Sequence, residues 1–126
     1  MIEENRPPKA KLLTMPEQSQ EPCAKMPAWL PREAKRYWRQ TAPELERRGV
    51  LVSLYQGLFT ALCCLWGNYV SMGEQIRRDG MVLTGRGGRQ YAHPLLAAQA
   101  RAFALFLKVS REFGMTPASR RRVSTQ

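Results

Sequence analysis

The sequence has little of the chemistry that metal sites use. In 126 residues it contains one histidine, His93, and three cysteines, Cys23, Cys63 and Cys64. Two of the cysteines are adjacent, no Cys-x-x-Cys pair exists, and the histidine is far from all three in sequence. A structural zinc ion needs four ligands at defined spacing. We therefore expect no metal ion and interpret the cysteines as reduced, small core residues.

Residues suited to catalysis are also scarce. The ten Asp and Glu residues are scattered, without a pair or cluster at metal-binding or acid–base spacing. His93 has no obvious nucleophile partner, and since it precedes Pro94 we interpret it as a cap of the next helix. The glycine-rich stretch 85–89 lacks the Gly-Lys-Ser/Thr ending of a phosphate loop, and no βαβ unit surrounds it. We predict no catalytic residue and no cofactor, so the protein is not expected to be an enzyme.

Long apolar runs are missing as well. No run reaches the ~20 residues that a membrane-spanning helix requires. The first residues include Glu3 and Glu4, where a secretory signal would carry cations followed by an apolar stretch. We expect a cytoplasmic protein with no membrane contact.

Positive charge is what the sequence has in excess. Twenty Lys and Arg residues against ten Asp and Glu give a formal charge of +10 and a pI near 10.3. Arginine outnumbers lysine fifteen to five, and its planar guanidinium suits bidentate phosphate contacts better than lysine does. A polyanionic partner is the natural inference, although surplus charge can also serve solubility alone.

The chain divides into an arm, one helical domain and a short tail. Residues 1–30 contain frequent prolines and no helical or strand period, which predicts a flexible arm. Residues 31–123 form the predicted domain, and 124–126 a tail. A first helix is expected to begin at Pro31, followed by a second short helix over 43–48 that ends at Gly49.

Two long helices dominate the predicted domain, which we assign to the all-α class. The first spans 54–79, with Ser53 as its cap and Gly80 as its stop. The second spans 94–113 and stops at Gly114, and a last short helix begins at Thr116-Pro117. We expect the long helices to form an antiparallel hairpin. In residues 81–93 the helical spacing of apolar residues ends, and this segment fits either a small β-hairpin or a flexible loop.

The long helices carry more apolar surface than one partner helix can cover. Each has two neighbouring apolar stripes at helical spacing. The remaining stripes need the short helices or another subunit, and in a chain of this size we expect both, self-association included. The expected contacts between subunits are Phe59, Trp66 and Val70.

Several groups of cations are candidates for contact with DNA. The strongest is the basic side of the first helix, although a solvated face is a common alternative for such a run. The arginines in the glycine-rich stretch fit backbone contact or simple exposure about equally. The full set is Arg32, Lys35, Arg36, Arg39, Arg47, Arg48, Arg86, Arg89, Arg120, Arg121 and Arg122.

An ordered series of short motifs resembles the small terminase subunit of tailed double-stranded DNA bacteriophages. The similarity covers about residues 30–123, and the closing Gly-x-Thr-Pro-x-Ser-Arg is its most specific part. The motifs are Leu30-Pro31, Glu33-Ala34-Lys35, Tyr37-Trp38, Pro43-Glu44-Leu45, Gly49-Val50-Leu51, Asp79-Gly80, His93-Pro94 and Phe113-Gly114-Met115-Thr116-Pro117-Ala118-Ser119-Arg120.

The resemblance implies a non-enzymatic packaging factor in the host bacterial cytoplasm. Members of that family form a homo-oligomeric ring, bind the double-stranded viral genome and recruit the large subunit, which carries the ATPase and nuclease. Two other interpretations of the residues stay open. One is a small helical DNA-binding transcriptional regulator with a helix-turn-helix, and the other is a protein-interaction module whose charge serves solubility. The sequence itself leaves the subunit number and the cognate DNA site undetermined.

Overall fold

The computed structural model describes residues 24–123, and the predicted helical character is confirmed over this range. Residues 1–23 of the predicted arm and the predicted tail lie outside it. In chain order the elements are α3 (Arg32–Arg47), the 3₁₀ turn η1 (Ser53–Tyr55), α4 (Gln56–Asp79), β1 (Val82–Thr84), the 3₁₀ turn η2 (Arg86–Gly88), β2 (Gln90–Ala92), α5 (Leu95–Glu112) and α6 (Pro117–Val123).

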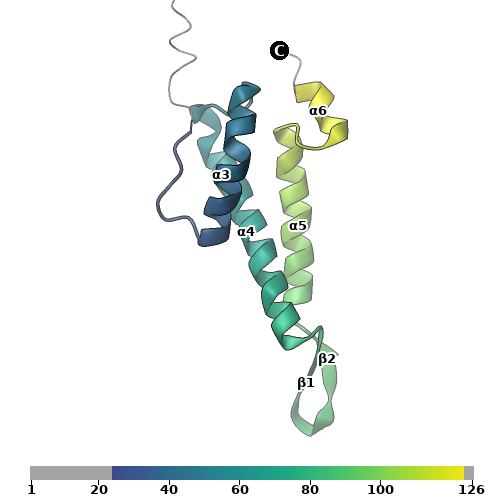
Figure 1. Ribbon diagram of the computed structural model, residues 1–126. Coiled ribbons are helices and arrows are strands. Elements are labelled where there is room, and N and C mark those ends of the chain that lie inside the picture. Colours follow the sequence, from purple (N-terminus) through teal and green to yellow (C-terminus); the bar gives the residue numbers. More distant parts are fainter. Residues whose placement is uncertain (1–23, 124–126) are drawn as a thin grey trace, which may run out of the picture.

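The helices are arranged as an elongated body with a projecting hairpin. In Figure 1, α4 and α5 lie side by side, and α3 packs against the first part of α4. The strands β1 and β2 extend from the end where α4 finishes and α5 begins, while α6 lies at the opposite end, next to the end of α5. The two ends of the molecule therefore present different elements.

The first helical region is one helix, which corrects the prediction of two. α3 runs from Arg32 to Arg47 with Pro43 inside it, and the following glycine, Gly49, has a positive φ of 75°. A proline removes one backbone donor, but a continuous helix places all its buried residues on one stripe. Burial of that stripe maintains the helix through the proline. The stripe consists of Ala34, Trp38, Ala42 and Leu45.

The core lies where α3, the start of α4 and the end of α5 meet. The Phe59 ring sits at its centre, with ring centroids 4.7 Å from Trp38 and 5.7 Å from Phe113. Leu30 is also buried, and Met26 packs against the same cluster. The packed domain thus begins before residue 31, and the last part of the predicted arm belongs to it.

Two residues were predicted to cap helices, and the structure confirms only one of them. Ser53 makes no capping hydrogen bond, because a 3₁₀ turn precedes α4 and the helix proper begins at Gln56, so that prediction was wrong. Thr116 does cap α6: its Oγ1 accepts the Ser119 N–H at 3.1 Å. Ser119 Oγ in turn accepts the Thr116 N–H at 3.2 Å, which makes a reciprocal capping arrangement.

The segment between the long helices forms the β-hairpin rather than a loop. β1 and β2 pair in antiparallel fashion, with Leu83 opposite Tyr91 and Thr84 opposite Gln90. A compact turn closes the tip, where Gly85 N–H donates to the Arg89 carbonyl at 2.7 Å. None of the helices within residues 24–123 has the length and apolarity needed to cross a bilayer.

Candidate nucleic-acid interface and assembly surface

The basic side of α3 is exposed, as a DNA contact requires. Arg32, Arg36 and Arg39 are exposed, and Lys35 is half-buried. Glu33 lies between two of them, 3.4 Å from Arg32 and 3.9 Å from Arg36. Ion pairs between exposed groups contribute only ~0–1 kcal/mol. The arginines on this side therefore stay available to a phosphate backbone.

The two arginines at the C-terminal end of α3 are less available than their sequence suggested. Glu44 is paired with Arg47, and it also accepts a hydrogen bond from Arg48 Nε at 2.9 Å. One carboxylate therefore neutralises part of the charge of both. The sequence carried a signal for this, because positions three and four residues apart share one helix face.

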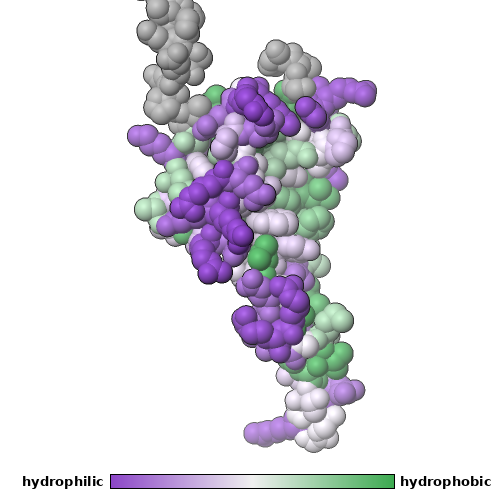
Figure 2. All heavy atoms as spheres, viewed as in Figure 1, coloured by the Kyte–Doolittle hydropathy of each residue, from purple (hydrophilic) through white to green (hydrophobic). Residues whose placement is uncertain are grey.

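A pair of arginines outside the predicted set extends the basic surface. Arg77 and Arg78 form the last turn of α4 and are exposed. Figure 2 shows hydrophilic side chains gathered over α3 and again over this end of α4. The two adjacent arginines before Gly80 were the available signal in the sequence.

The structure does not bring all the candidate cations together. Arg86 and Arg89 are exposed at the tip of the hairpin. The run from Arg120 to Arg122 is exposed on α6, at the opposite end of the molecule. These two groups cannot form one patch within a single protomer, so each is a separate candidate surface.

Among the predicted subunit contacts, Phe59 was placed wrongly. It is 0% exposed and lies inside the protomer's own core, so it has no surface to offer to another copy. Trp66 is half-buried against three aromatic rings of the same protomer, at centroid distances of 5.5 Å from Tyr37, 5.4 Å from Tyr69 and 5.2 Å from Phe106. Val70 is also half-buried. For these two, contact with a second copy stays a prediction.

One stretch of uncovered apolar surface lies on α5. This helix is rich in Leu, Ala and Phe, yet its only buried residues are Ala102 and Ser110. Phe103 is 41% exposed and Leu105 is 44% exposed. Figure 2 shows hydrophobic residues along α5, away from the hydrophilic side chains that gather over α3. The basic and apolar surfaces are therefore separate.

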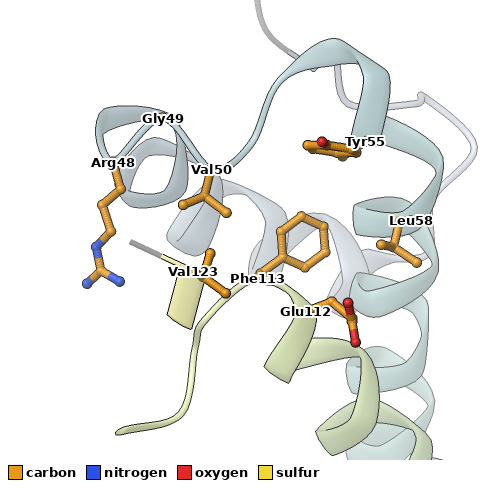
Figure 3. A pocket seen from close by; sticks show the side chains of 8 residues that line it. All are labelled: Arg48, Gly49, Val50, Tyr55, Leu58, Glu112, Phe113 and Val123. Atoms are coloured by element: carbon orange, nitrogen blue, oxygen red, sulfur yellow. The ribbon is translucent and has the colours of Figure 1, made fainter. Parts of the chain in front are cut away.

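A second apolar area lies at the start of α4, next to a pocket. Leu54, Tyr55 and Leu58 are exposed there. The pocket has a volume of about 350 Å³ and is enclosed by the ends of α3, α5 and α6 (Figure 3). It contains one carboxylate and one guanidinium but no paired acid–base groups. Its lining residues are Arg48, Gly49, Val50, Tyr55, Leu58, Glu112, Phe113 and Val123.

The described thiols are core residues, as predicted from the sequence. Cys63 is buried and Cys64 is half-buried, and neither is in a disulfide. Burial raises the pKa of Cys63 to about 12, and the neighbouring Cys64 thiol adds to the rise. Such a thiol is a poor nucleophile near neutral pH. Among residues 24–123, no three His, Cys, Asp or Glu side chains gather where they would hold a metal ion.

Comparison with known proteins identifies the family. The family described as "Phage terminase, small subunit" matches residues 34–126, which include α3, both long helices, the hairpin and α6. Comparisons with curated proteins and with solved structures gave no match. The match covers most of the chain, and the resemblance drawn from the motifs is thereby confirmed. The chain belongs to the phage terminase small-subunit family, and this membership supports a role in phage genome packaging.

Proposed function

We propose that this protein is a packaging factor that self-assembles, binds double-stranded viral DNA and recruits the large terminase subunit. The observation that carries the proposal is the separation of two surfaces on one small domain. Exposed arginines lie on α3 and at the end of α4, whereas apolar side chains are exposed along α5. A packaging adaptor needs one surface for phosphates and another for copies of itself.

Self-assembly follows from the exposed apolar surface of α5. An amphipathic helix normally buries a wide apolar stripe, and α5 buries little of its own within the protomer. Phe103 and Leu105 leave substantial apolar area in water. Each Å² of apolar surface removed from water contributes about 25 cal/mol. A second copy seated on α5 would recover that free energy.

DNA binding follows from the exposed arginines and from assembly itself. Arg32, Arg36 and Arg39 reach solvent from one helix, and each phosphate neutralised releases counterions from the duplex. A single α3 offers few contacts. Several copies joined in one assembly would engage the same DNA together, and effective concentration would raise the overall affinity.

Recruitment of the large subunit is assigned to α6. The run from Arg120 to Arg122 lies on α6, away from the hairpin and beside the pocket at the start of α4. A basic helix next to an apolar pocket suits an acidic segment that also carries apolar residues. The same run also fits DNA, so α3 and α6 need to be compared in one experiment.

The test is the affinity for a 30-bp duplex of random sequence, measured by fluorescence anisotropy over a range of salt concentrations. The triple change of Arg32, Arg36 and Arg39 to Ala should flatten the slope of log affinity against log salt. The slope should change by ~0.9 for each phosphate that a subunit no longer neutralises. Affinity should fall equally on unrelated sequences, because phosphate contacts do not read bases.

Two further variants make the result interpretable. Changing Arg101, Lys108 and Arg111 to Ala removes the same number of charges from α5 and should leave the slope nearly unchanged. Changing Arg120, Arg121 and Arg122 to Ala tests α6. If only that variant loses DNA affinity, α6 rather than α3 holds the duplex. If wild-type protein shows no salt-dependent affinity, the DNA-binding part of the proposal is wrong.

A further inference from the structure

We infer that the β1–β2 hairpin is a DNA-reading ribbon that enters the major groove. The inference rests on the proposed function, since it assumes that the protein binds double-stranded DNA. It adds the element that makes the contact, the groove it enters and the side chains that face the bases. These side chains are Thr84, Arg86, Arg89 and Gln90.

The hairpin has the shape that this role requires. It projects beyond the helices at one end of the molecule, and no other element of residues 24–123 lies beside its tip (Figure 1). A Cβ built on Gly87 or Gly88 would meet no atom within 4 Å. Two paired strands lie ~4.8 Å apart, and the major groove, ~12 Å wide, admits a two-stranded ribbon. The tip is therefore narrow enough and free enough to enter the groove.

The two faces of the ribbon differ in chemistry. Side chains alternate between faces along a strand, so Leu83 and Tyr91, which are paired, share one face. The Tyr91 ring covers Gly85 on that face, where a built Cβ would lie 3.3 Å from the ring. The paired Thr84 and Gln90 lie on the other face, toward the tip, and the paired Val82 and Ala92 share that face nearer the helices. Threonine, glutamine and arginine are side chains that hydrogen-bond to base edges in the major groove.

The charge of the ribbon favours DNA over a protein partner. No acidic residue occurs between Asp79 and Glu112, so Arg86 and Arg89 have no counter-charge of their own. Within residues 24–123 neither is in an ion pair, whereas four arginines in or directly after α3 share Glu33 or Glu44. The two arginines at the tip therefore have no acidic partner among the described residues.

The ribbon is fixed in direction by the buried His93. Its ring is 6% exposed, and Nε2 lies 2.9 Å from Asp79 Oδ2 at the end of α4. Its Nδ1 accepts the Leu95 N–H at 3.0 Å, and its backbone N–H donates to the Met81 carbonyl at 2.8 Å. One residue thus ties together the end of α4, the base of the ribbon and the start of α5. A ribbon held in this way can enter a groove without a large loss of conformational entropy.

The experiment compares two forms of one 30-bp duplex. In the second form every cytosine is replaced by glucosylated 5-hydroxymethylcytosine, which fills the major groove and leaves the phosphates and the minor groove unchanged. Wild-type protein should bind the glucosylated duplex at least tenfold more weakly. The double variant Arg86→Ala with Arg89→Ala, and separately Thr84→Ala with Gln90→Ala, should bind both forms with a ratio close to one.

The controls separate this inference from the proposed function. The variant Arg101→Ala with Arg111→Ala removes the same charge from α5 and should keep the wild-type ratio. Circular dichroism and mass in solution should be unchanged in all variants. If wild-type protein binds neither duplex, the proposed function fails. If it binds both equally, or if both ribbon variants keep the wild-type ratio, the inference is overturned while DNA binding stands. A ribbon variant that changes the mass in solution would overturn it in favour of a subunit contact.

Discussion

Val123 packs directly over Gly114, so closely that a Cβ on this glycine would lie 2.8 Å from the Val123 Cβ. Gly114 also has a φ of 66°, in the left-handed region that other residues avoid. The end of α5 and the docking of α6 therefore depend on this glycine for two separate reasons.

Replacing Gly114 with Ala should destabilise the protein. The left-handed backbone alone costs a non-glycine residue ~1–2 kcal/mol, and the clash with Val123 adds to this. The measurement is the free energy of unfolding in urea. Gly57→Ala is the matched control, because Gly57 lies inside α4 with no atom within 4 Å of a built Cβ. That change should stabilise the protein by up to ~1 kcal/mol through helix propensity. Equal effects of the two substitutions would contradict the packing described.

Two phenylalanines on neighbouring helices should behave in opposite ways. Phe59→Ala should lower the free energy of unfolding by ~3–5 kcal/mol, because this ring fills the core. Phe103→Ala should change the stability of the protomer far less, since its ring is 41% exposed, and should instead weaken self-assembly. Urea unfolding and sedimentation velocity on both variants check this. An assembly weakened by Phe59→Ala but not by Phe103→Ala, at equal folded fraction, would place the contact elsewhere.

The contact between Asp79 and His93 at the base of the ribbon should stabilise the protein less in acid. Hydrogen bonds from Gln75 and then His93 hold the pKa of Asp79 below its ordinary value of 3.8. A carboxyl whose pKa is lowered on folding stabilises the native state above its unfolded pKa and loses that effect as pH falls through the folded value. Relative to Asp79→Asn, the wild type should therefore lose its advantage as pH falls below the unfolded pKa of the carboxyl and through the folded one. An advantage that persisted unchanged into strong acid would contradict this assignment.

The two described thiols should differ in reactivity toward Ellman's reagent. In a Cys23→Ser background, Cys63 should stay unreactive in the folded protein at pH 8, because it is buried and its pKa is raised to about 12. Cys64, which is half-buried with a smaller rise in pKa, should react slowly. Both should react at once in guanidinium chloride. Fast modification of Cys63 without denaturant would mean that the core opens readily.

Local signals in the sequence predicted the helices and their ends well. The predicted stops at Gly49, Gly80 and Gly114 all have positive φ in the structure, because a glycine that follows an apolar helical run commonly takes the left-handed conformation that ends a helix. The cap at Thr116 was predicted because a Thr-Pro pair is typical of a helix start. Pro43 was a misleading signal, since a proline by itself indicates a helix break. Only the buried stripe on both sides of it shows that the helix continues.

The exposed surfaces were harder to predict, because they depend on which apolar stripes of the helices pack against each other. Phe59 and Phe103 each belong to an apolar stripe of a long helix. Phe59 is nevertheless buried in the core, whereas Phe103 is 41% exposed. The sequence indicated how much apolar surface was in excess but not on which helix it would remain. Likewise, Arg47 and Arg48 were predicted to be available to DNA, but in the structure both are paired with Glu44.

The most direct test of the packaging role is the mass of the purified wild-type protein in solution, measured by light scattering at micromolar concentration. The exposed surface of α5 predicts a single species at a fixed multiple of the protomer mass of 14.4 kDa. Because the basic and apolar surfaces are separate, the species should keep its mass when a short duplex is added, apart from the mass of the DNA itself. A protein that remains at 14.4 kDa, with and without DNA, would contradict the proposed role.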